Sequence, residues 1–119
     1  MLAGRYQSVL DHEKLDVYQC AIEFLEVAFA TVGRLPRGHA SLADQLRRAA
    51  TSIPLNIAEA AGKTSPQDRA HFHAIARGSA MKCGAIMDVV RLLKVAEPEV
   101  TRAKDLLVRA VSMLSKMCR

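Results

Sequence analysis

Aromatic residues are scarce in this chain of 119 residues, which has three Phe, two Tyr and no Trp. The cores of β-sandwiches rely on aromatic and β-branched side chains, and this composition does not favour them. Half of the residues are nonetheless hydrophobic, so the core must be built from Leu, Ile, Val, Met and Ala. That set of side chains suits helix-on-helix packing, and the sequence predicts an all-α fold.

Long apolar runs and paired cysteines are also missing. No segment reaches the roughly 18 uncharged apolar residues of a membrane span, and residues 1–10 lack the apolar run of a signal peptide. Cys20, Cys83 and Cys118 are odd in number and far apart, as expected of free thiols in a reducing compartment. We therefore expect a cytoplasmic protein without membrane contact, folded as one domain over residues 1–119.

The residue spacings that support catalysis or metal binding are absent too. The chain has no Gly-rich phosphate loop, no paired-carboxylate helix motif, and no Ser or Cys with a recognisable base. His71 and His73 are two residues apart and point in different directions on a helix, unlike an i, i+4 metal-binding pair. We expect no enzymatic activity, no catalytic residues, no cofactor and no metal.

Gly and Pro divide the chain into four segments with helical periodicity. Gly33 and the Pro36–Gly38 stretch end the first segment, and Thr64-Ser65-Pro66 is a strong helix start, with a capping hydroxyl followed by Pro at the first helical position. Short connections favour antiparallel neighbours, which predicts an up-down-up-down four-helix bundle. The first, third and fourth predicted helices span residues 13–33, 66–96 and 99–118. The second predicted helix runs from an N-cap at Ser41, through Pro54, to Gly62.

Apolar residues at steps of three and four predict the inward face of each helix. For the first helix these are Leu15, Tyr18, Ile22, Leu25, Phe29 and Val32. For the later helices they include Leu46, Ile53, Ile57, Phe72, Ala76, Cys83, Ile86, Val90, Leu107, Ala110 and Leu114. Gly78 and Gly84 each cost about 1 kcal/mol relative to Ala in a helix, which predicts a packing reason for them. An apolar surplus predicts an interface between copies, and its members are Tyr6, Val9, Leu10, Leu55, Val89 and Leu92.

The net charge of +5 is distributed unevenly. Residues 1–33 hold two basic and five acidic groups, whereas residues 34–119 hold fifteen basic and seven acidic ones, so −3 is followed by +8. Two interpretations remain open. An acidic surface of one subunit could dock onto a basic surface of another, or a basic face could attract phosphate.

A polar stripe runs along the second helix beside its apolar face. Steps of four, four and three align Arg48, Ser52, Asn56 and Glu59, and a turn near residues 63–64 would place Ser79 opposite Arg48. This stripe could be a polar site between the second and third helices. It could equally be a hydrogen-bond network that fixes helix register and satisfies the backbone freed by Pro54. The full set of stripe residues is Gln45, Arg48, Ser52, Asn56, Glu59 and Ser79.

Basic residues run through the middle of the chain, and a phosphate-binding surface would need several of them on one face. The candidate nucleic-acid-binding residues are Arg47, Arg48, Arg77 and Lys82. Solvated charge on helix exteriors would account for most basic residues equally well.

Three segments carry a family resemblance: 45–50 (QLRRAA), 52–59 (SIPLNIAE) and 72–79, which ends in IARGS. With residues 15–19 and 113–114, they resemble the four-helix-bundle proteins encoded in intervening sequences of bacterial large-subunit (23S) ribosomal RNA genes, over about residues 12–117. The sequence departs from that pattern at Ala60, where Gly is usual, and at Lys82, where an acidic residue is usual.

The resemblance implies a left-handed up-down bundle, assembly as a ring-like homopentamer, and no established enzymatic activity. Distant relatives, the accessory variability proteins of diversity-generating retroelements, bind a reverse transcriptase and nucleic acid through a basic surface. The implied partners are thus further copies of the chain, RNA or DNA, and a protein such as a reverse transcriptase. Our hypothesis is a homo-oligomeric accessory protein that binds nucleic acid or nucleoprotein. The alternative is a protein-binding oligomeric scaffold without nucleic-acid affinity.

Overall fold

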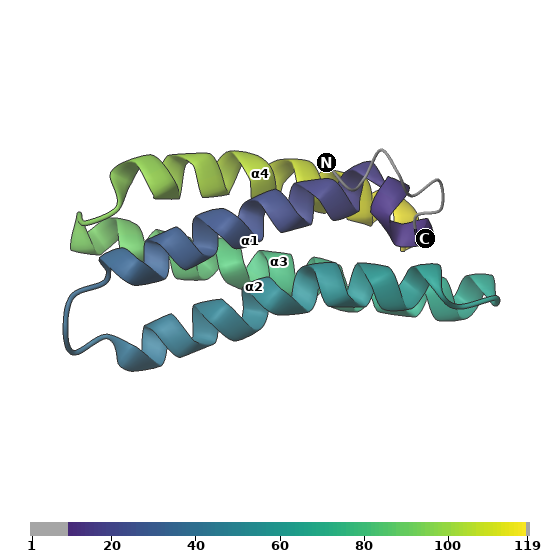
Figure 1. Ribbon diagram of the computed structural model, residues 1–119, viewed down its shortest axis with the longest axis horizontal. Helices are drawn as coiled ribbons and strands as arrows, with labels where there is room; N and C mark the ends of the chain where they lie inside the picture. The colour runs from purple at the N-terminus through teal and green to yellow at the C-terminus, as the bar shows by residue number, and fades with distance from the viewer. Residues whose placement is uncertain (1–9, 119) are drawn as a thin grey trace, which may run out of the picture.

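The computed structural model describes residues 10–118, which form four long α-helices preceded by a short 3₁₀ helix. Figure 1 shows the helices lying alongside one another, joined by short connections at the two ends. The elements are η2 (Asp11–Lys14), α1 (Asp16–Arg34), α2 (Ala40–Ala61), α3 (Pro66–Leu93) and α4 (Glu97–Met117).

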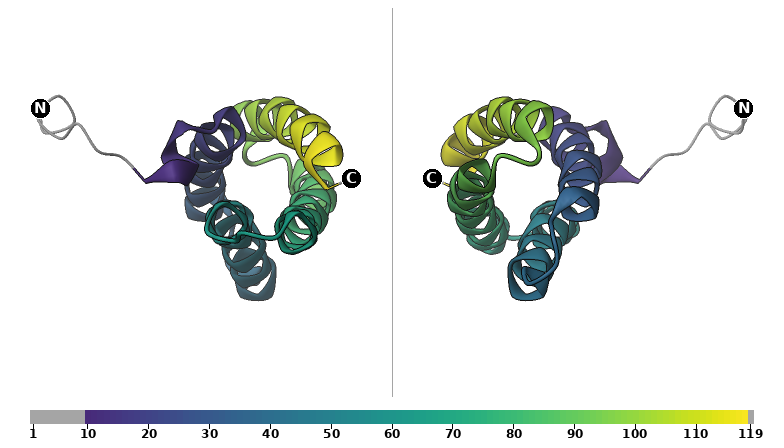
Figure 2. Two further views of the ribbon diagram at one scale, coloured as in Figure 1. Left: turned by 90° about the vertical axis from the view of Figure 1, so that its right-hand side faces the viewer. Right: turned by 90° about the vertical axis from the view of Figure 1, so that its left-hand side faces the viewer.

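Each α-helix packs against the helices that precede and follow it in the chain, and α4 packs back against α1. Viewed along the bundle, the four helices form a closed ring around a shared interior (Figure 2). This arrangement confirms the predicted all-α class and is consistent with an up-down bundle. None of the described helices combines the length and the apolar character needed to cross a membrane.

Local sequence signals set some helix ends but not others. The predicted start of α3 is confirmed, because the Ser65 side chain accepts a hydrogen bond from the Asp68 backbone N–H at 3.3 Å. The predicted N-cap at Ser41 is wrong, since α2 already begins at Ala40 and has no side-chain cap. Pro54 lies inside α2, as predicted. Helix α3 ends at Leu93, earlier than predicted, where Lys94 adopts a left-handed conformation with φ 57°.

The apolar interior matches the predicted inward faces of α2 and α4, and most of that of α3. On α3, the predicted residues Phe72, Ser79 and Leu93 are only half-buried. The neighbouring His73 is 7% exposed and has its Nδ1 3.2 Å from the Met117 carbonyl oxygen. Predicted residues that are fully or almost fully buried are Leu46, Ile53, Ile57, Ala76, Cys83, Ile86, Val90, Leu107, Ala110 and Leu114.

The predicted inward face of α1 is partly wrong. Leu15, Tyr18, Leu25 and Val32 are half-buried and pack against the edge of the core. Ile22 is 42% exposed and Phe29 is 50% exposed, while Phe24 is completely buried. Helix α1 carries two apolar stripes, and the bundle covers the one with more small residues, since small side chains let neighbouring helices approach closely. The buried residues of α1 are Val17, Cys20, Ala21, Phe24, Val27, Ala28 and Thr31.

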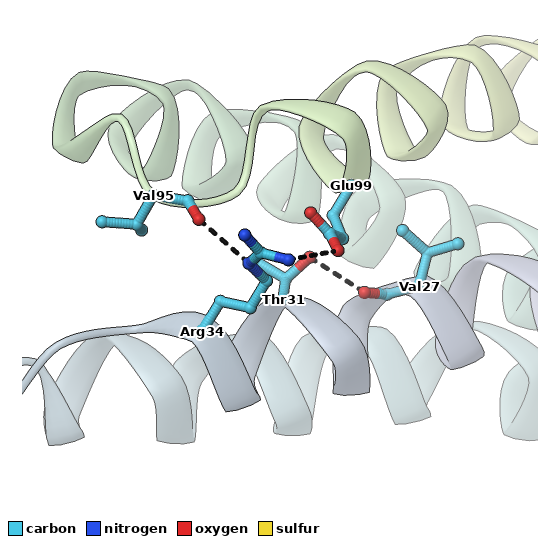
Figure 3. Close-up of polar contacts among 5 residues, drawn as sticks. All are labelled: Val27, Thr31, Arg34, Val95 and Glu99. Atoms are coloured by element: carbon cyan, nitrogen blue, oxygen red, sulfur yellow. Dashed lines mark hydrogen bonds and ion pairs between the residues drawn. The ribbon is translucent and has the colours of Figure 1, made fainter.

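One polar cluster ties the end of α1 to the start of α4 (Figure 3). Arg34 Nε donates to the Val95 carbonyl oxygen at 3.0 Å, and Arg34 Nη1 lies 3.4 Å from Glu99 Oε2. The buried Thr31 hydroxyl donates within α1 to the Val27 carbonyl oxygen at 2.8 Å. Arg34 therefore joins the end of α1 to the start of α4, because one guanidinium contacts both a carbonyl of the α3–α4 connection and one oxygen of the Glu99 carboxylate.

The buried thiols link stability to pH. Burial raises the pKa of the Cys83 thiol from its ordinary 9.0 to about 12. The unfolded chain ionises this thiol near pH 9 and the folded chain does not, so this contribution to stability is present below pH 9 and is lost as the pH rises towards 12.

We therefore expect the stability difference between the native protein and Cys83→Ala to narrow above pH 9. The difference in the free energy of unfolding should shrink by up to about 1.4 kcal/mol per pH unit. Only the native protein contains the Cys83 thiol, whose ionisation in the unfolded chain lowers stability. Urea unfolding with a reductant at pH 8, 9.5 and 10.5 measures it. A difference that stays constant over this range would contradict the prediction.

Candidate nucleic-acid interface

Three residues of the predicted polar stripe form one hydrogen-bond network across the α2–α3 boundary. Ser79 Oγ of α3 donates to Ser52 Oγ of α2 at 2.9 Å. Asn56 Nδ2 donates to the same hydroxyl oxygen at 2.9 Å and to the Ser52 carbonyl oxygen at 2.8 Å. All three side chains are half-buried. The network therefore uses the Ser52 hydroxyl and the Asn56 amide nitrogen for contacts within the protein.

This network corrects the predicted helix register. Ser79 meets Ser52, one helical turn further along α2 than the predicted partner Arg48. Side chains tilt towards the N-terminus of their helix, so in an antiparallel pair the true partner on α2 lies closer to the turn than a count of Cα positions suggests. The Asn56 amide also bonds the Ser52 carbonyl oxygen and not that of Ala50, which Pro54 leaves without its helical donor.

The remaining stripe residues stay at the surface of α2. Arg48 Nε lies 3.1 Å from Asp44 Oδ2, and Lys63 Nζ lies 3.1 Å from Glu59 Oε2, both pairs at i, i+4 spacing. Such exposed pairs contribute little stability. Gln45 is exposed and makes no side-chain hydrogen bond within the described chain. The stripe is thus divided between a structural network and solvated charges.

Three of the four candidate nucleic-acid-binding residues are exposed near this network. Arg47 and Arg48 line one shallow depression on α2 that also includes Ser52. Arg48 is one turn before Ser52, and Lys82 is almost one turn after Ser79. Because α2 and α3 are antiparallel, these two steps lead in the same direction and bring Arg48 and Lys82 to about the same level. We call Arg47, Arg48 and Lys82 the basic patch.

Arg77 is separated from the basic patch. Its Nε donates to Ser115 Oγ of α4 at 2.7 Å, and its side chain is half-buried. Residues two apart on a helix point about 200° apart, so Arg77 lies on the α4 side of α3 while Ser79 lies on the α2 side. Periodicity around α3 alone could have indicated this separation.

The electrostatics of the patch are those of exposed side chains. Within residues 10–118, Arg47 and Lys82 have no carboxylate within 4.0 Å, and Arg48 has Asp44. No group of three or more His, Cys, Asp or Glu in the described part of the chain is placed to hold a metal ion. Chemically, the patch offers cationic donors to an anion at the surface.

Comparison with known proteins finds a family match that extends over the whole bundle. The family model described as 23S rRNA-intervening sequence protein matches residues 13–116, which covers all four α-helices almost completely. No curated protein matches the chain.

If the Ser52–Asn56–Ser79 network is structural, Ser52→Ala should lower the free energy of unfolding by about 1–2 kcal/mol, because two donors lose their shared acceptor. Urea denaturation measures the loss. The matched control, Ser112→Ala, removes an exposed serine hydroxyl on α4 and should change stability by less than about 0.5 kcal/mol. Equal stability of Ser52→Ala and the control would rule out a structural network.

Proposed function

The chain belongs to the 23S rRNA-intervening sequence protein family, and we propose that it is a non-enzymatic, homo-oligomeric accessory protein that binds nucleic acid or nucleoprotein through the basic patch. The exposure of Arg47, Arg48 and Lys82 beside a self-satisfied polar network supports this proposal most directly. Arg47 and Lys82 have no carboxylate within 4.0 Å in the described chain, so these two cationic groups remain available to an external anion, while Arg48 shares its charge with Asp44.

The charge of the chain supports the same proposal. Residues 34–119, which include α2, α3 and α4, carry a net charge of +8. A basic surface attracts the phosphate backbone without reading sequence, and the attraction falls as salt rises because counterions are released. Repetition of the patch on several copies would strengthen the field along a polyanion.

Exposed apolar side chains support the oligomeric part of the proposal. Leu10, Leu55 and Leu92 are 65%, 62% and 78% exposed, and Val89 is 46% exposed. Two other members of the predicted surplus, Tyr6 and Val9, lie outside the described residues. The same surfaces would serve a protein-binding scaffold without nucleic-acid affinity. An oligomer that binds no RNA or DNA at low salt would favour that alternative.

The double substitution Arg47→Glu with Lys82→Glu tests the basic patch. We expect weaker binding to a generic single-stranded RNA. The negative slope of log K against log salt should become shallower by roughly 1.4 if both side chains contact phosphate. Filter binding or fluorescence anisotropy between 50 and 200 mM salt measures both quantities.

The matched control is Arg37→Glu with Lys94→Glu, which makes the same change in charge in the α1–α2 and α3–α4 connections. It should retain more affinity than the patch variant. An equal loss in both variants would mean that net charge alone attracts RNA, and unchanged binding by the patch variant would overturn the assignment of the patch.

A further inference from the structure

An apolar pair lies on the same face of the bundle as the basic patch. Leu55 of α2 and Ile75 of α3 are 62% and 38% exposed, and Leu55 lines the same shallow depression as Arg47 and Arg48. Leu55 follows Arg48 by seven residues, and Ile75 precedes Lys82 by seven residues. Seven residues are close to two full helical turns. On each helix the apolar side chain and the cation therefore point in nearly the same direction.

The contact between α2 and α3 brings the two apolar residues to one level of the bundle. Ser52 of α2 meets Ser79 of α3, and the two helices run antiparallel (Figure 1). Leu55 is three residues after Ser52 and Ile75 is four residues before Ser79, so both steps lead towards the α2–α3 turn. We call Leu55 and Ile75 the apolar shelf. It lies about 10 Å along the bundle from Arg48 and Lys82, because seven residues of helix rise by that distance.

Gly78 leaves the surface of α3 open between the apolar shelf and the basic patch. It follows Ile75 by three residues and precedes Lys82 by four, spacings that place all three on one face of α3. The predicted packing reason for Gly78 and Gly84 is not found within the described chain, because a Cβ added at either position would meet nothing within 4 Å. Glycine allows a ligand to approach the backbone closely. At Gly78 this open space lies where a ligand would cross from the patch to the shelf.

These surfaces together fit a single strand of nucleic acid better than a duplex. In a duplex the bases are paired and stacked inside, so the outer surface offers mainly phosphate and sugar to a protein. An apolar shelf beside the cations would gain little from that surface. A single strand exposes the faces of its bases as well as its phosphates, and proteins bind it by combining cationic groups with side chains that cover the bases.

We propose that the basic patch and the apolar shelf form one site for single-stranded nucleic acid. In this site the cations bind phosphate, and Leu55 and Ile75 contact the faces of neighbouring bases. Every base has an apolar face, so such contacts tolerate many sequences. The inference rests on the proposed function, because it specifies the class of nucleic acid that the basic patch binds.

The shelf variant Leu55→Ser with Ile75→Ser tests this site. A short unstructured RNA is used both free and annealed to its complement. Binding of the single strand should weaken roughly fivefold, because apolar contact area is lost, and binding of the duplex should not change. The slope of log K against log salt should also stay the same, since the substitutions remove no charge. Fluorescence anisotropy at several salt concentrations measures these quantities, and circular dichroism checks that the helix content is native.

The matched control is Ile22→Ser with Val108→Ser, which removes exposed apolar side chains from α1 and α4. It should bind both RNAs as the native chain does. A second pair of variants tests the open space on α3. Gly78→Gln should weaken binding of the single strand, whereas Gly84→Gln, which lies in the α3–α4 groove, should not. Gln favours a helix more than Gly does, so neither variant should lose stability.

Unchanged binding of the single strand by the shelf variant would overturn the inference and leave the shelf to a protein partner. An equal loss for the single strand and the duplex would overturn it too, as would an equal loss in the control. A native chain that binds neither RNA at low salt would refute the proposed function itself. Native binding with an ineffective shelf variant would instead confine the failure to the apolar shelf.

Discussion

Burial of Phe24 is the contact on which the rest of the architecture depends. Among residues 10–118 it is the largest fully buried side chain, and removing such a side chain from water contributes about 1.5–3 kcal/mol. With Phe24 pointing inward, α1 is rotated so that Ala21 and Ala28 face the neighbouring helices. The same rotation turns Ile22 and Phe29 outward, so one packing choice defines both the core and the exposed apolar surface.

Polar contacts fix the positions of the helices relative to one another along their axes, and each contact lies at a different helix boundary. Ser52 with Ser79 joins α2 to α3, and Arg77 with Ser115 joins α3 to α4. Arg34 joins α1 to the connection before α4. Apolar packing tolerates small shifts along a helix axis, whereas a half-buried hydrogen bond is lost when its partner moves by one turn. These hydrogen bonds therefore define the position of each helix along its axis more sharply than the apolar interior does.

The basic patch draws on two helices, because Arg47 and Arg48 lie on α2 and Lys82 lies on α3. All three side chains are exposed in the single chain, and the proposed oligomer would carry one such patch on each subunit. A ring or chain of copies would then repeat the basic patch at regular intervals. Such repetition suits a polyanion better than a single patch does, since phosphate charges also repeat along a strand.

The sequence by itself determined the four helices, the start of α3 at Ser65, the inward faces of α2 and α4, and the alignment of Ser52 with Asn56. These follow from helical periodicity and capping, which act within a few residues. Only the tertiary structure decided which stripe of α1 is buried, that Ser79 meets Ser52, and that Arg77 is used by α4. The rotation and register of a helix depend on the sizes and tilts of side chains on its neighbours, and those neighbours lie far away in the sequence.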